Sequence, residues 1–242
     1  MSLDFNGVND LLQMPSSTLG QSVSRMSCFI RLMKRTATGA RLVFISTGVS
    51  SLASRFSIEY GASQFIRPGG RVLDGDSFVS VSSVTLYPEG IFYNLFVEVD
   101  YAANTVIIRG YDDSGLIASE TLSIGFTAAT VTSNTQPSLS RIGANGTGGQ
   151  PFDGIIEQLS LYQDANFSNN EVDAMVVGGK GWDLGTRRNQ NVFDLRLNEA
   201  PDGNTSSTPV DYSFNNFVVE KNGSPIYRGQ THTKFNRRRA NG

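Results

Sequence analysis

Short runs in which apolar and polar residues alternate recur along most of the chain. Because successive side chains of a strand point to opposite faces, this period of two predicts strands with one buried side. Turn residues such as Gly61, Pro88 and Asn104 separate the runs, and most neighbouring runs have no helical pattern between them. This spacing favours an antiparallel sandwich over parallel strands joined by helices. The runs expected to form strands are Ser24–Leu32, Leu42–Ile45, Phe56–Tyr60, Phe78–Leu86, Phe92–Val99, Thr105–Gly110 and Ile117–Ile124.

One short helix is expected to begin at Ser168. Ser168 and Glu171 have the spacing of a capping box, in which each side chain accepts a hydrogen bond from an otherwise unpaired backbone amide. Val172, Met175 and Val176 follow at spacings of three and four, which gives the helix one apolar face. A pair of glycines then ends it.

The composition excludes several other classes of protein and of site. Charged residues are 17% of the 242 residues and the net charge is −2, which argues against coiled coils and against a disordered chain. Cys28 is the only cysteine, so a disulfide within the chain and a cysteine-ligated zinc site are excluded. His232 is the only histidine, which excludes a multi-histidine metal site within one chain.

Several blocks, in the same order, resemble concanavalin A-like domains of the laminin-G type. The most specific block is Pro151–Tyr162, which the expected helix follows as it does in that family. The resemblance implies an all-β fold, a two-sheet antiparallel jelly-roll sandwich with one short helix, over residues 1–178. This fold serves lectins, glycosidases, adhesion modules and virion proteins, so it leaves the function open. The other blocks are Leu3–Pro15, Met26–Leu32, Phe92–Asp100, Asn104–Gly110 and Ile142–Asn145.

Residues 179–242 form a C-terminal extension with three interpretations. Val192–Glu199, Val210–Phe217 and Lys221–Pro225 are similar to the segment that family members carry before their opening strand. The extension would then complete the sandwich with a circularly permuted strand. Alternatively, it adds a strand to a neighbouring copy of the chain, or it is an unrelated addition.

The two parts of the chain differ in charge. Residues 1–177 hold 10 basic and 16 acidic residues and residues 178–242 hold 10 basic and 6 acidic residues, so the balances are −6 and +4. The basic part ends in Lys234, Arg237, Arg238 and Arg239. We expect this cluster to bind acidic protein surface on a neighbouring subunit.

One carboxylate pair matches part of the catalytic motif of the glucanases that share this fold. Those enzymes use Glu-x-Asp-x-(x)-Glu on one strand, where alternation puts the acids on one face. Glu98 and Asp100 match the first two acids, but Tyr101, Ala102 and Ala103 follow, so the third carboxylate is absent. We interpret Glu98 and Asp100 as an acidic pair on the solvent side and expect no hydrolase activity.

Calcium is the cofactor for which the resemblance suggests ligands. Laminin-G-type domains often hold one calcium in their loops, and Asp74, Asp76, Asp112 and Asp113 are loop acids of the kind that calcium binds. Asp-Gly and Asp-Ser-Gly are also ordinary turn sequences, and we favour that interpretation, so no cofactor is expected. The aromatic residues that could stack on sugars, or else pack in a core or an interface, are Trp182, Phe193, Phe214 and Phe217.

Two classes of function fit these observations. The first is a non-enzymatic virion structural protein of a bacteriophage: a capsid decoration, head-fibre or tail-associated subunit, made in the host cytoplasm. Its partners would be copies of itself and other particle proteins. The alternative is a carbohydrate-binding module of a cell-surface or adhesion protein, with a surface glycan as ligand. The acidic N-terminus lacks the apolar core of a signal peptide, so secretion by that route is not expected. No run reaches about 18 apolar residues, so membrane insertion is not expected either. Nucleic acid is not an expected partner.

Overall fold

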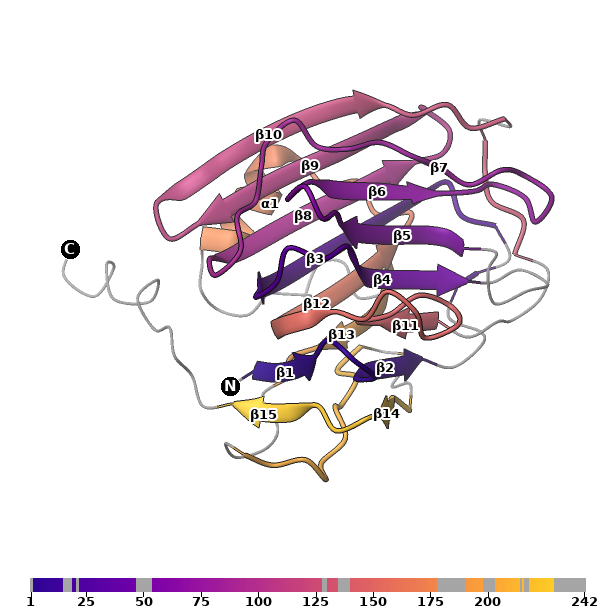
Figure 1. Cartoon of the computed structure of the whole chain (residues 1–242). Helices are drawn as coiled ribbons and strands as arrows, with labels where there is room; N and C mark the ends of the chain where they lie inside the picture. Colours follow the sequence, from indigo (N-terminus) through magenta and orange to yellow (C-terminus); the bar gives the residue numbers. More distant parts are fainter. Residues whose placement is uncertain are drawn as a thin grey trace.

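A computed structural model of the protein describes residues 2–14, 19–20, 22–46, 54–127, 130–134, 140–177, 190–197, 203–213, 215 and 218–228. Two antiparallel sheets face each other in these parts of the chain (Figure 1). Sheet A has the order β10 (Gly115–Ser123), β9 (Thr105–Asp112), β8 (Phe92–Asp100), β3 (Arg25–Lys34), β12 (Asp153–Gln163), β1 (Ser2–Asn6) and β15 (Ile226–Arg228), and β13 (Asn191–Leu195) also pairs with β12. Sheet B has the order β14 (Glu220–Asn222), β2 (Leu11–Met14), β11 (Ser140–Ile142), β4 (Ala40–Ser46), β5 (Ser54–Tyr60), β6 (Ile66–Gly70) and β7 (Val79–Ser80). The predicted all-β, two-sheet antiparallel sandwich is confirmed.

The main core lies between the two sheets. In β3, Cys28 and Ile30 point inward, and their neighbours across the ladder to β8 are Val97 and Leu95. All four side chains are fully buried. Burial also raises the pKa of the Cys28 thiol, so this cysteine stays protonated inside an apolar environment.

A second apolar cluster covers the outer face of sheet A. Phe29 of β3 lies at its centre, with its ring centroid 4.8 Å from that of Phe96 and 5.2 Å from that of Phe167. Val172 and Val176 of helix α1 (Asn169–Val177) belong to the same cluster. The helix therefore packs on the side of sheet A that faces away from sheet B.

The predicted capping box of α1 is confirmed. The backbone amide of Ser168 donates to Glu171 Oε2 at 2.8 Å, and the amide of Glu171 donates to Ser168 Oγ at 3.3 Å. The expected apolar face is also present, because Val172 and Val176 are buried and Met175 packs against them. No helix in the described ranges has the length and apolarity needed to cross a membrane.

The predicted strand Phe78–Leu86 is wrong beyond its first residues. Only Val79–Ser80 forms a strand, β7, at the edge of sheet B. Further along, Ser83 still donates its backbone amide to the carbonyl of Ile66, but the amides of Val84 and Thr85 donate to the carboxylate of Glu120. The segment therefore leaves β6 after Ser83, and the side chain of Glu120 on β10 satisfies the next two amides.

The described strands of the C-terminal part pair within the same chain. β13, which contains most of the strand-like run Val192–Leu197, pairs with β12. β14 pairs with β2 at one edge of sheet B, and β15 pairs with β1 at one edge of sheet A (Figure 1). The domain division at residue 178, and docking of the extension on a neighbouring subunit, stay predictions.

One lysine is buried at the end of a central strand. Lys34 is 1% exposed, and its Nζ lies 4.5 Å from the ring centroid of Tyr60. This Nζ has no hydrogen-bond partner among the described residues. Burial lowers the pKa of the Lys34 amine, an effect that the carboxylates of Glu89 and Asp153 oppose.

We predict that Lys34 makes the stability of the protein depend on pH. The unfolded chain holds more protons at this position than the folded chain, so stability from this group rises with pH up to about 10.4, the ordinary pKa of lysine. Relative to the variant Lys34→Met, the wild type should gain free energy of unfolding as the pH rises from about 7 to about 10, just below the pKa of lysine in the unfolded chain. Urea denaturation at both pH values measures this, and a constant difference between the two proteins would contradict it.

Candidate functional site

The two outer faces of the sandwich differ in character. α1 and its apolar cluster occupy the outer face of sheet A, whereas polar side chains cross the outer face of sheet B. In one cross-strand row the registers align Glu220, Gln13, Arg141, Phe44, Ser57, Gly69 and Ser80. In the next row, Arg41, Glu59 and Arg67 lie side by side. We call Arg41, Ser57, Glu59, Arg67, Phe78, Arg141 and Gln150 the sheet B face.

Arg41 is held firmly at the centre of the sheet B face. Its Nη1 donates to Ser57 Oγ at 2.7 Å, and its Nη2 donates to Gln150 Oε1 at 3.2 Å. Its Nε is buried without a hydrogen-bond partner among the described residues. Burial lowers the pKa of the Arg41 guanidinium; Glu59 opposes this effect and Arg67 adds to it.

A single carboxylate lies between two guanidinium groups. Glu59 Oε2 is 3.4 Å from Arg41 Nη2, and Glu59 Oε1 is 3.6 Å from Arg67 Nη1. Arg67 also donates from Nη2 to Ser80 Oγ at 3.1 Å, while 43% of its side chain is exposed. The arginine side chains are therefore oriented by the protein, and one of them still reaches solvent.

An aromatic ring lies against the same polar groups. The Arg41 guanidinium carbon is 5.7 Å from the ring centroid of Phe78. The ring also approaches β6 where the sheet has a glycine, because a Cβ built on Gly69 would lie 2.9 Å from Phe78 Cζ. The same Cβ would lie still closer to the carbonyl oxygen of Val79, so the glycine permits both β7 and the half-buried ring to lie close to β6.

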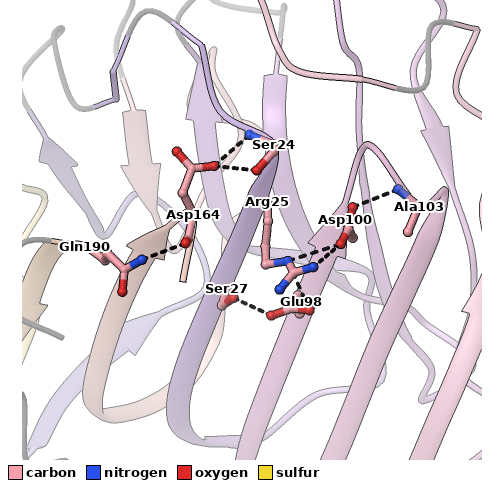
Figure 2. A network of polar contacts seen from close by, with 8 residues as sticks. All are labelled: Ser24, Arg25, Ser27, Glu98, Asp100, Ala103, Asp164 and Gln190. Atoms are coloured by element: carbon pink, nitrogen blue, oxygen red, sulfur yellow. Dashed lines mark hydrogen bonds and ion pairs between the residues drawn. The ribbon is translucent and has the colours of Figure 1, made fainter. Parts of the chain in front are cut away.

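A different network surrounds Arg25 on the outer face of sheet A (Figure 2). Arg25 Nε donates to Asp100 Oδ2 at 3.1 Å and lies 3.6 Å from Glu98 Oε1. Ser27 Oγ donates to Glu98 Oε2 at 2.8 Å. Asp164 accepts hydrogen bonds from the amide and hydroxyl of Ser24, both at 2.7 Å.

The interpretation of Glu98 and Asp100 as a solvent-side pair is wrong. Both residues are buried, at 4% and 6% exposure, because β8 is an interior strand between β3 and β9 and the side chains of Arg25 and Ser27 lie against them. Burial raises the pKa of the Glu98 carboxyl, which the bond from Ser27 and the charge of Arg25 oppose. Both carboxylates are therefore engaged by neighbouring side chains.

The four candidate calcium ligands do not form one cluster. Asp74 pairs with the buried guanidinium of Arg55, and Asp76 Oδ2 accepts the backbone amide of Leu73 at 2.9 Å. These two lie between β6 and β7, whereas Asp112 and Asp113 lie at the turn between β9 and β10. Asp112 Oδ1 accepts the amide and hydroxyl of Ser114 at 2.7 and 2.6 Å. Within the described ranges, no group of three or more His, Cys, Asp or Glu residues is placed to hold a metal ion.

The remaining sequence candidates lie in the core or outside the described residues. Phe193 of β13 is fully buried in the main core, as its packing interpretation predicted. The sequence candidates that lie outside the described residues are Trp182, Phe214, Phe217, Lys234, Arg237, Arg238 and Arg239.

Sequence reasoning missed the sheet B face. Arg41, Glu59 and Arg67 occupy alternating, outward positions of three separate strands, so each alone resembles an ordinary solvent-facing residue. The sequence did offer one signal, because β4 and β6 each contain an arginine and β5, which lies between them, contains a glutamate. Only the strand register shows that these side chains meet.

We predict that the network around Arg25 is structural. Asp100→Ala removes an acceptor of Arg25 and of the amide of Ala103, and should lower the free energy of unfolding by about 2 kcal/mol, between the values for exposed and buried ion pairs. Asp113→Ala, in an exposed turn, is the control and should change stability by less than about 0.5 kcal/mol. Urea denaturation measures the free energy of unfolding of both variants, and an equal decrease in the two would refute the structural role.

We also predict that calcium does not stabilise the fold. The carboxylates of Asp74, Asp76 and Asp112 already accept hydrogen bonds or ion pairs from the protein. Calcium and EDTA should therefore leave the thermal midpoint unchanged within about 2 °C. A larger stabilisation by calcium that Asp112→Asn abolishes would show that the turn is a metal site.

No family model and no curated protein sequence matches the chain. Solved structures do resemble it. A putative carbohydrate binding protein from Bacteroides ovatus ATCC 8483 superposes with a TM-score of 0.56 at 11% identity, over 93% of this chain and 60% of that one. For the native heptameric SAP-like pentraxin from Limulus polyphemus the TM-score is 0.53 at 13% identity, over 92% and 94%. For the CBM40 of Ruminococcus gnavus IT-sialidase, bound to α2,3 sialyllactose, it is 0.51 at 15% identity, over 72% and 96%.

Identities this low concern the fold and not the ligand. The first two superpositions extend over more than nine tenths of this chain. Together with the antiparallel pairing of the described strands, they show that the chain has the concanavalin A-like jelly-roll fold that its sequence resembles.

Proposed function

We propose that this protein is a non-enzymatic carbohydrate-binding module whose ligand lies on the sheet B face. The observation that carries the proposal is the combination of an aromatic ring with oriented polar side chains on the face opposite α1. Phe78, Arg41 and Gln150 form the centre of this arrangement. Two of the structures with this fold are named for carbohydrate binding, which supports the proposal.

The residue types suit a sugar. A sugar ring has apolar C–H groups on its faces and hydroxyl groups around its edge, so its sites combine aromatic rings with a few fixed hydrogen-bonding groups. Phe78 supplies a ring, Arg67 supplies donors, and Gln150 supplies both a donor and an acceptor. Because Ser57 and Glu59 already orient the arginines, little side-chain freedom would be lost on binding.

The same face lacks the chemistry of a glycosidase. Hydrolysis of a glycosidic bond ordinarily uses two carboxyl groups on either side of the bond. Glu59 is the one carboxylate among the residues of the sheet B face, and two guanidinium groups hold it. Glu98 and Asp100 lie on the other sheet, buried and paired. These placements support binding without turnover.

The virion role expected from the sequence remains a second proposal. It rests on the charge difference between the two parts of the chain and on the basic cluster Lys234, Arg237, Arg238 and Arg239, which lies outside the described residues. None of the three structures compared above is a virion protein. Mass spectrometry of purified phage particles would test this role, and it is compatible with a glycan-binding surface.

The binding proposal predicts a specific effect of Phe78. A glycan array identifies a ligand, and isothermal titration calorimetry then compares variants. Phe78→Ala should weaken binding about tenfold, the loss expected for a stacked ring. The matched control is Tyr212→Ala, because Tyr212 is exposed and stacks on Arg196 at 4.7 Å beside sheet A. Absence of any bound glycan, or loss in the Tyr212 variant alone, would contradict the proposal.

A further inference from the structure

The sheet B face carries more positive than negative charge, although the whole chain has a net charge of −2. Arg41 and Arg67 share the carboxylate of Glu59. Arg141, in the neighbouring row, donates from Nη1 to the carbonyls of Asn145 and Gly146 at 3.3 and 2.8 Å. Three guanidinium groups therefore accompany one carboxylate in this set of residues.

The acidic residue at the far end of the row does not balance this excess. Glu220 lies on β14 and accepts a hydrogen bond from Gln13 Nε2 at 2.7 Å. β2 and β11 separate β14 from β4, the strand of Arg41. Glu220 is also exposed, so water and salt screen its charge.

The arginines are arranged to receive an anion. Arg41 is fixed by Ser57, Gln150 and the ring of Phe78, and 13% of its side chain is exposed. Arg67 is fixed through Ser80 yet remains 43% exposed in its side chain. A guanidinium group binds carboxylate or sulfate oxygens through two parallel hydrogen bonds, and side chains that are already oriented lose less entropy on binding.

We propose that the sheet B face selects a negatively charged sugar, whose carboxylate or sulfate group binds at Arg41 and Arg67. This inference rests on the proposed function and names the class of ligand. Glu59 keeps the two guanidinium groups apart and oriented without neutralising both. Phe78 then contacts the apolar side of the same or the adjacent sugar ring.

Matched pairs of ligands test the selectivity. Calorimetry compares 3′-sialyllactose with lactose, polygalacturonate with its methyl ester, and dextran sulfate with dextran. We expect the acidic member of at least one pair to bind at least about tenfold more tightly, as one charge-assisted hydrogen bond provides. Preference for the first two pairs identifies a carboxylate, and preference for the third identifies a sulfate. Equal binding within every pair overturns the inference but leaves the proposed glycan binding intact. If the protein binds no sugar on a glycan array, the proposed function itself is refuted.

Variants separate a built site from general charge attraction. Arg67→Gln, at a partly exposed position, should weaken the acidic ligand about tenfold. Arg41→Lys keeps the charge but loses the planar fork, and should also weaken binding. The control is Arg196→Gln, since Arg196 is 48% exposed and stacks on Tyr212 away from sheet B. Thermal midpoints show that each variant is folded. Unchanged affinity in Arg67→Gln, or equal losses in Arg67→Gln and Arg196→Gln, would overturn the inference.

Discussion

The docking of α1 on sheet A is the contact that gives the two outer faces of the sandwich different characters. Phe29 makes this docking possible, because its ring lies among Phe96, Tyr162 and Phe167 on the outer face of β3. The inner face of β3 is in the main core, so the strand is buried on both sides. The helix and its cluster thus occupy the apolar part of the outer face of sheet A. The rows of polar side chains described above lie on the outer face of sheet B, on the other side of the sandwich.

Local signals in the sequence were sufficient for the elements near this docking contact. The capping box of Ser168 and Glu171 depends on residues three positions apart, and such hydrogen bonds form wherever the helix begins. The alternating run Ser24–Leu32 likewise predicts the strand β3, although only the structure shows that Phe29 buries the second face of this strand as well. Alternation and turn residues then led to the antiparallel sandwich, because period two and tight turns are themselves local properties.

Properties that depend on strand neighbours could not be predicted in this way. Glu98 and Asp100 are polar and close a strand, which is typical of exposed residues, but β8 has partners on both sides and Arg25 lies against them. The segment after Ser80 alternates like a strand, yet Glu120 accepts its amides. The sheet B face required the alignment of Arg41, Glu59 and Arg67 across three strands. Such a register depends on turns and bulges that lie far from these residues in the sequence.

The pairing of the C-terminal strands constrains the order in which the molecule is completed. Ser2 pairs with Arg228 and Leu12 pairs with Lys221, so one side of β1 and one side of β2 find their partners in the last described strands. Contacts between such distant residues form late, because a long loop must close first. During synthesis, both sheets would therefore keep an unpaired edge after β12 has been made and until β14 and β15 follow. An unpaired edge accepts strands of another chain as readily as its own, so this interval is when newly made copies are most exposed to joining one another.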